Sequence, residues 1–272
     1  MWGVRVRILS GSQLSLLVTI PRLIYSSDYR TTAGIGQAMA DFDFDQFKRE
    51  FMDGMNNAAG AVTSAAKETS GDFVRFKHFC EIGRDISIRG LVTSHGGNLS
   101  ECDGSSIWIS RSGVMLGHMA TNDIVRTFMS PTDLDQKASR ELVVHRAMYQ
   151  AWASRMAGMK QDFGYRAIVH THSLYTVLRS LVDDSIKPID SEGKLVLGES
   201  VPVFNPSVTI ASEEVAELMA DFISSGASVG VIRGHGPFAM ADTLENAYQL
   251  ISCLEYSSEL LTHYERVTHP VL

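Results

Sequence analysis

The segment Ile168-Val169-His170-Thr171-His172-Ser173 places two histidines two positions apart at the end of a short apolar run. In an extended strand, residues two apart project from the same face, so both imidazoles can reach one point. A catalytic zinc site usually takes three protein ligands and a structural site four, so a further donor is needed. We predict His235, in Arg233-Gly234-His235-Gly236, as that donor. The alternative is that the two histidines simply end a strand as ordinary side chains.

The composition limits the class of protein. The chain has 272 residues, enough for a full hydrophobic core in one large domain or two small ones. Its hydrophobic content of 44% and charged content of 20% are those of an ordinary globular protein. The formal net charge of −7 argues against a nucleic-acid partner, because such surfaces usually carry a basic excess. Three cysteines without CxxC spacing offer no disulfide framework, so a reducing compartment, the cytoplasm, is expected.

The first forty residues differ from the rest. They carry arginines and serines and have no acidic residue before Asp28, a composition typical of an organellar transit peptide. The alternative is that Met39 is the true start, because an acidic, amphipathic segment follows directly. In both cases we expect residues 1–40 to be a disordered extension and residues 41–272 to form the folded domain. No apolar run approaches the roughly 18 to 20 residues that a membrane-spanning helix needs, so no membrane association is expected.

Apolar periodicity and capping residues predict the helices. Ser139 is expected to cap one that runs to about Met156, with Glu141 in its first turn, where the helix dipole favours a carboxylate. Ser212 is expected to cap another, and Asp242 with Glu245 to open the last as a capping box. The predicted helices span about 45–56, 73–89, 139–156, 173–182, 213–225 and 242–263.

Short apolar segments between these helices predict strands over 107–109, 165–170, 195–204 (one or two) and 228–233. The mixture has no regular βαβ alternation, which predicts an α+β fold with helices packed over a sheet. Two glycine-containing segments, Gly96-Gly97-Asn98 and Ser110-Arg111-Ser112-Gly113, lie between elements. Paired glycines expose backbone N–H groups that can cradle an anion. Plain β-turns explain the same residues, because glycine and asparagine favour turns for steric reasons.

The chain contains five short motifs in the following order: Gly-Gly-Asn, Ser-x-Ser-Gly, Ser-x-Glu at a helix start, His-x-His on a strand, and Gly-His-Gly before a long helix. Together they resemble the class II aldolase and adducin-head family, whose best-known enzyme is L-fuculose-phosphate aldolase. The resemblance covers about residues 73–265. It implies a three-layer α/β/α arrangement with a central, mostly antiparallel sheet flanked by helices. It also implies a homotetramer with active sites at the subunit interfaces.

The resemblance also assigns residues. It implies that His170, His172 and His235 bind Zn²⁺ or another divalent metal, and that Glu141 is the catalytic acid and base. The substrate phosphate would rest on Gly97, Asn98, Ser112, Gly113, Ser139 and Arg140. Aldolases of the family often have a serine or threonine where Arg140 stands, and a guanidinium there could bind phosphate or carboxylate in bidentate fashion.

One family feature has no counterpart here. The family aldolase takes a proton donor, a tyrosine, from the neighbouring subunit, but the corresponding stretch 186–198 contains no tyrosine. Tyr264 is our candidate replacement.

The activity implied is that of a lyase acting on a small sugar phosphate. A ketose 1-phosphate of the fuculose, ribulose or deoxyribulose type would be cleaved to dihydroxyacetone phosphate and an aldehyde, with zinc stabilising the enediolate and Glu141 moving the proton. The alternatives on the same scaffold are a methylthioribulose-phosphate dehydratase, a sugar-phosphate 4-epimerase and a metal-dependent decarboxylase. The glutamate at position 141 disfavours the epimerase, which carries an aspartate there. A non-catalytic, adducin-like binding module is disfavoured by the three retained histidines.

Overall fold

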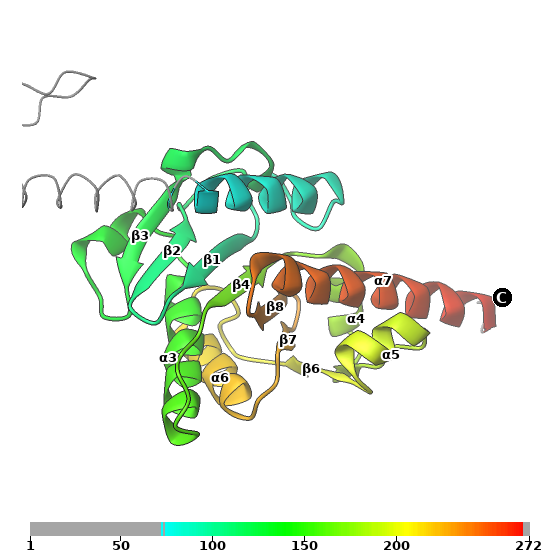
Figure 1. The fold of residues 1–272 in the computed structure, drawn as a ribbon. Coiled ribbons are helices and arrows are strands. Elements are labelled where there is room, and N and C mark those ends of the chain that lie inside the picture. Colours follow the sequence, from blue (N-terminus) through cyan, green and yellow to red (C-terminus); the bar gives the residue numbers. More distant parts are fainter. Residues whose placement is uncertain (1–71, 73, 269–272) are drawn as a thin grey trace, which may run out of the picture. The chain divides into compact units, whose positions relative to one another are not determined.

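The computed structural model of the chain describes residues 72 and 74–268, and within them eight strands form one sheet in the order β3-β2-β1-β4-β8-β7-β6-β5 (Figure 1). Neighbouring strands are antiparallel except β6 and β7, which are parallel. The strands are β1 (Asn98–Cys102), β2 (Ser106–Ser110), β3 (Ile124–Phe128), β4 (Arg166–His170), β5 (Ser185–Ile186), β6 (Val201–Phe204), β7 (Val229–Ile232) and β8 (Gly236–Ala241).

Helices cover both faces of this sheet. On one face α3 (Leu142–Gly158) and α6 (Glu213–Ser224) pack side by side, and on the other lie α7 (Leu244–Thr268) and a helix over residues 74–88 (Figure 1). Two shorter helices, α4 (Leu174–Ser180) and α5 (Ser191–Leu197), pack against α7. Three 3-10 turns complete the set: η1 (Leu116–His118), η2 (Thr121–Asp123) and η3 (Asp133–Lys137).

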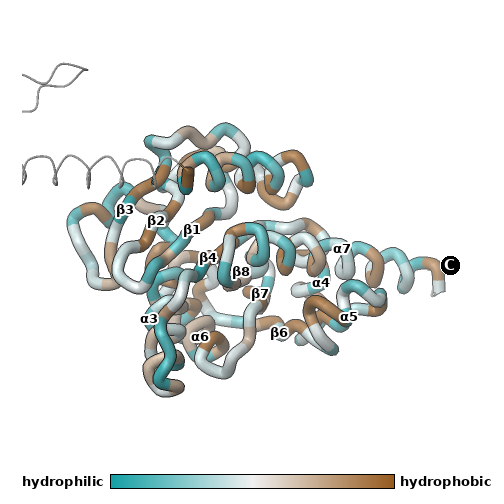
Figure 2. Tube along the Cα trace, in the orientation of Figure 1, coloured by the Kyte–Doolittle hydropathy of each residue, from teal (hydrophilic) through white to brown (hydrophobic). Residues whose placement is uncertain are grey.

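The alternation of side chains along the strands produces two cores. In β4, Ile168 packs into the core beneath α3 and α6, whereas its neighbour Val169 packs into the core beneath α7 and the 74–88 helix. In β2, Ile109 and Trp108 divide in the same way. Along α7 the residues change repeatedly between hydrophilic and hydrophobic, as expected of a helix with one face on a sheet (Figure 2). The predicted α+β fold, with three layers and a mostly antiparallel sheet, is confirmed.

Several predicted elements need correction. Ser139 does not cap α3: the helix begins at Leu142, and Glu141 occupies the cap position without a side-chain cap bond. Residues 195–197 belong to helix α5 rather than to a strand, because the Asp190 carboxylate accepts a hydrogen bond from the Gly193 N–H and starts the helix there. At the start of α7, the Asn246 N–H donates to Thr243 Oγ1, so Thr243 fills the role that we gave to Asp242.

Four strands were missed altogether, namely β1, β3, β5 and β8. Each contains polar or small residues that weaken the alternation signal, and each is fixed by its neighbours in the sheet. The predicted extension over 1–40, the start at Met39 and the helix over 45–56 lie outside the described residues. Within the described ranges, no helix is long and apolar enough to cross a membrane.

Candidate metal centre and catalytic site

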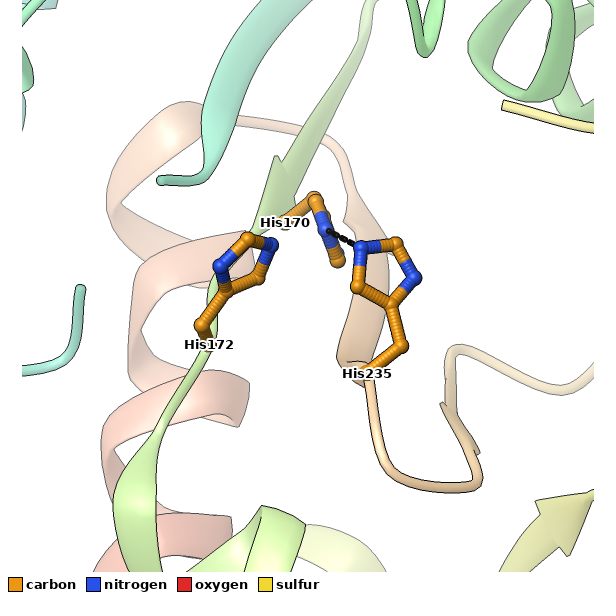
Figure 3. A group of neighbouring side chains, drawn as sticks. All are labelled: His170, His172 and His235. Carbon is orange, nitrogen blue, oxygen red and sulfur yellow. Dashed lines mark hydrogen bonds between the residues drawn. The ribbon is translucent and has the colours of Figure 1, made fainter. Parts of the chain in front are cut away.

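Three histidines from two separate parts of the chain converge at one end of the sheet. His170 is the last residue of β4, His172 follows two positions later, and His235 lies in the turn between β7 and β8. One ring nitrogen from each lies within 4.8 Å of the others, and the three rings point toward a common centre (Figure 3). The side chains of His170 and His235 are buried and that of His172 is half-buried.

The turn that carries His235 is shaped by its two glycines. Gly234 has φ +68° and Gly236 has φ +149°, both in the region that favours glycine. A Cβ atom on Gly236 would lie 2.0 Å from the carbonyl oxygen of Thr171, so only glycine allows β8 to approach the end of β4 this closely. The Gly-His-Gly sequence is therefore a geometric requirement for bringing His235 to His170.

The orientation of His170 is fixed from both sides. Its Nδ1 lies 2.9 Å from the carbonyl oxygen of Pro237, which can only accept, so Nδ1 carries the proton and Nε2 keeps its lone pair. The ring of Phe238 stacks on the imidazole with centroids 3.9 Å apart and an interplanar angle of 13°. Sequence reasoning missed Pro237 and Phe238, although both directly follow the Gly-His-Gly motif.

His172 lies against the glycine turn before β1. A Cβ atom on Gly96 would come within 2.6 Å of His172 Nδ1. The first glycine of the Gly-Gly-Asn motif therefore makes room for an imidazole, a role that the sequence analysis did not foresee.

The three imidazoles are held neutral. Burial lowers the pKa of His170 well below its usual value, and the neighbouring His235 and His172 lower it further. Burial also lowers the pKa of His172, and burial together with His172 lowers the pKa of His235 to about 4. Neutral imidazoles are the form that binds a cation.

The spacing of one pair of donors matches that around a tetrahedral metal ion. Nitrogens that each lie 2.0 to 2.1 Å from a tetrahedral zinc are separated by roughly 3.3 Å. The Nε2 atoms of His170 and His235 are 3.3 Å apart. Three neutral nitrogen donors with room for a fourth ligand are typical of catalytic rather than structural zinc.

Glu141 brings a carboxyl group to the same place. Its Oε1 lies 3.8 Å from His235 Nε2 and accepts a hydrogen bond from the backbone N–H of Ala211. Its Oε2 is buried and has no hydrogen-bond partner among residues 72 and 74–268. Burial raises the pKa of Glu141 to about 7, although the Ala211 N–H opposes the shift. A carboxyl group with such a pKa can both accept and donate a proton near neutral pH.

The segments predicted to hold phosphate lie along the same end of the sheet. Asn98 opens β1 and pairs with His170 across the β1–β4 ladder. Ser110, at the end of β2, accepts a hydrogen bond from the Leu99 N–H through its side chain and from the Ser139 N–H through its backbone carbonyl. These contacts bring the turn before β1, the loop after β2 and the start of α3 next to the histidines. Gly97 and Gly113 have φ +75° and +71°, as tight turns require.

A cavity of about 610 Å³ lies beside these loops. It is lined by Ser112, Ser139 and Arg140 and by side chains of α3 and η3, but not by the three histidines or Glu141. Within it Arg146 is paired with Asp135 at 2.9 Å. In the described part of the chain Arg140 has no hydrogen-bond or ion-pair partner. Arg140, unpaired within the described residues, therefore lies at the border between this cavity and the segments predicted to hold phosphate.

Comparison with known proteins shows the family of this chain. The sequence model described as the class II aldolase and adducin N-terminal domain matches residues 77–262. An L-fuculose phosphate aldolase of Methanococcus maripaludis is 28% identical over 184 residues, which cover 67% of this chain and 93% of the relative. A methylthioribulose-1-phosphate dehydratase of Acidiphilium cryptum is 27% identical over 209 residues, covering 71% of this chain and 93% of the relative.

The fold comparison gives the same result. The crystal structure of l-fuculose-1-phosphate aldolase from Thermus thermophilus superposes with a TM-score of 0.64 and 28% sequence identity. The superposition covers 72% of this chain and 97% of that protein.

Proposed function

This chain belongs to the class II aldolase and adducin N-terminal domain family, and we propose that it is a metal-dependent lyase that cleaves a ketose 1-phosphate into dihydroxyacetone phosphate and an aldehyde. The observation that carries the proposal is the convergence of three neutral imidazoles beside one buried carboxyl oxygen that has no hydrogen-bond partner in the described residues. The relatives named above support the reaction class, because aldolases of sugar phosphates are among them.

The metal would be held by His170, His172 and His235. When bound, a divalent cation acts as a Lewis acid that draws negative charge onto substrate oxygens as the carbon–carbon bond breaks. We propose Zn²⁺, because three nitrogen donors and an open position suit it. The Pro237 carbonyl keeps the Nε2 lone pair of His170 directed at the cluster.

Glu141 would move the proton. Its Oε2, without a partner in the described residues, can accept the proton of the substrate hydroxyl whose carbon becomes the aldehyde. The same atom can return that proton to the carbon left by the departing aldehyde. The Ala211 N–H holds Oε1 and so fixes the direction in which Oε2 faces. If a separate residue, rather than Glu141, delivers the proton to the carbon, Tyr264 is our candidate for it.

The substrate phosphate would be held by the loops beside the cluster. Backbone N–H groups at the turns and a guanidinium would supply the contacts, from Gly97, Asn98, Ser112, Gly113, Ser139 and Arg140. A phosphate held in these loops would place the reacting carbons next to the histidines. The binding energy of the phosphate would then offset the entropy lost when the substrate is oriented for reaction.

We also propose that the protein assembles as a homotetramer with the active sites at the subunit interfaces. Exposed apolar side chains in and directly after α4 support association, because Leu174, Leu181 and Val182 are 66%, 58% and 70% exposed shortly after the histidine pair.

A second candidate function is dehydration of methylthioribulose 1-phosphate. It is favoured by the Acidiphilium cryptum relative, whose identity and coverage are close to those of the aldolases. The same carboxyl group would then remove a proton from carbon, and water would leave instead of an aldehyde.

One assay separates the two. The full chain, loaded with Zn²⁺, is incubated with fuculose, ribulose and deoxyribulose 1-phosphates and, separately, with methylthioribulose 1-phosphate. Release of dihydroxyacetone phosphate supports the aldolase. A product whose mass is lower than that of methylthioribulose 1-phosphate by one water, detected by mass spectrometry, supports the dehydratase instead. A metal-loaded protein that converts none of them refutes both.

The metal site is tested in parallel. His170→Ala should lose bound metal, whereas His263→Ala, at an exposed position on α7, should retain it. Equal metal content in the two variants would show that His170 is not a metal ligand.

A further inference from the structure

Four consecutive residues, His235-Gly236-Pro237-Phe238, shape or contact the histidine cluster. His235 enters the cluster itself, and Gly236 allows β8 to approach the end of β4. The two residues that follow contact His170, which lies far earlier in the chain. One short segment therefore supplies one ring of the cluster and contacts a second.

Phe238 is placed for this contact by the sheet. It pairs directly with His170 in the β4–β8 ladder, so the two side chains leave the sheet on the same face. Its ring is fully buried and lies nearly parallel to the imidazole of His170. It also meets the ring of His235 edge-on, with centroids 6.3 Å apart. Two rings of the cluster thus rest against one phenyl ring.

A further contact to Phe238 comes from α3. His145, one turn after Glu141, meets the phenyl ring edge-on at 6.0 Å. The Nδ1 of His145 lies 2.6 Å from Ser100 Oγ, which links α3 to β1. Phe238 cannot tilt without displacing this buried contact.

We propose that Phe238 is a positioning residue of the metal site, which holds the His170 ring in the plane required for binding, while the Pro237 carbonyl selects its tautomer. The inference rests on the proposed function in one respect, namely that His170 is a metal ligand. Residues that orient a ligand from behind typically contribute a factor of about 10 to 100 in metal affinity. An apolar side chain of different shape would fill the space but leave the imidazole free to tilt.

The test compares Phe238→Leu with Phe79→Leu in the full chain. Phe79 is also fully buried, but it lies in the core on the opposite face of the sheet. We expect Phe238→Leu to weaken Zn²⁺ binding about 10- to 100-fold in competition with a chromophoric chelator. We expect Phe79→Leu to lower thermal stability but to leave the affinity within about twofold of the wild type. Equal affinity in Phe238→Leu and the wild type would overturn the proposal.

Two further measurements cover a variant that fails to fold. Phe238→Tyr keeps the flat ring and is expected to retain both the affinity and the visible spectrum of the Co²⁺-loaded wild type. In the wild type itself, nitrogen NMR of the histidine side chains should show His170 with its proton on Nδ1, assigned by loss of the signal in His170→Asn. A proton on Nε2 would contradict the orientation argued here. If the wild type binds no metal, the proposed function itself fails, which is a separate outcome.

Discussion

Asn98 and His170 face each other in the antiparallel pairing of β1 and β4. Directly opposed residues in such a pair have Cα atoms about 4.5 to 5.5 Å apart. A residue predicted to bind phosphate is therefore the immediate neighbour of a predicted metal ligand. The side chain of Asn98 is buried, and its Oδ1 has no hydrogen-bond partner in the described chain.

Replacing Asn98 by leucine should impair substrate binding more than turnover. The change keeps the size of the side chain but removes its N–H donor, and a hydrogen bond to a charged group is worth about 1.5 to 3 kcal/mol. We expect KM for the sugar phosphate to rise roughly tenfold or more with little change in kcat. Asn122→Leu, at an exposed position in η2, is the control. A fall in kcat at constant KM would contradict a role in binding.

Replacing Arg140 by serine should weaken binding of the phosphate group of the substrate. This guanidinium has no partner in the described residues, so its charge is free for the substrate. Loss of a charge-assisted contact should raise KM by about 10- to 100-fold and weaken inhibition by inorganic phosphate to a similar extent. Arg140→Lys should retain part of the wild-type binding, and Arg266→Ser, at an exposed position near the end of α7, should have no effect. Unchanged phosphate inhibition in Arg140→Ser would exclude Arg140 from the phosphate site.

Replacing Glu141 by glutamine should reduce kcat by about 10²- to 10⁴-fold, because proton transfer is lost while shape and metal ligands remain. Metal content should stay at the wild-type level. The control is Glu217→Gln on α6. A variant that keeps wild-type turnover would remove Glu141 from the mechanism.

The same variant should change the pH dependence of stability in the metal-free protein. The pKa of Glu141 is raised to about 7 from an ordinary value of 4.5, so the folded state loses stability as pH rises from about 4.5 to about 7. At pH 8 Glu141→Gln should therefore be more stable than the wild type, by on the order of 3 kcal/mol. The difference should vanish below about pH 4.5, as urea unfolding at a series of pH values would show. A constant difference at all pH values would contradict the raised pKa.

His145 should contribute acid sensitivity. Complete burial lowers its pKa to about 3 from 6.5, so between these values the unfolded chain binds a proton that the folded chain does not. Stability is then lost as pH falls below about 6.5, by up to about 1.4 kcal/mol per pH unit from this residue. In metal-free protein His145→Gln should flatten the acid limb of the unfolding free energy, whereas His118→Gln, at an exposed position, should not. Identical slopes would show that His145 titrates normally.

Replacing Gly96 by alanine should disturb His172. The added methyl group would lie 2.6 Å from His172 Nδ1, too close for contact without movement of the ring. We expect metal affinity to fall by at least about tenfold, measured by chelator competition. Gly158→Ala is the matched control, because a Cβ atom there meets no atom within 4 Å. Wild-type affinity in Gly96→Ala would mean that His172 can move freely or is not a ligand.

The sequence by itself determined the class of fold and which three histidines lie together. Spacing of two along a strand predicted that His170 and His172 lie on one side, and the Gly-His-Gly motif singled out His235 as the third donor. The sequence did not predict β1, β3, β5 and β8, because their residue patterns are weak. These strands form because adjacent strands complete their hydrogen bonds. The sequence also misplaced the start of α3, since local capping preference favoured Ser139 while the packed structure begins the helix at Leu142.

Only the tertiary structure decided which distant groups meet. Strand register joined Asn98 to His170, and the approach of β8 to β4 brought the Pro237 carbonyl and the Phe238 ring onto the same imidazole. The raised pKa of Glu141 likewise comes from burial beneath residues that are remote in sequence. Local sequence patterns predict the secondary structure of each segment, but contacts between residues far apart in the sequence depend on how the whole chain folds.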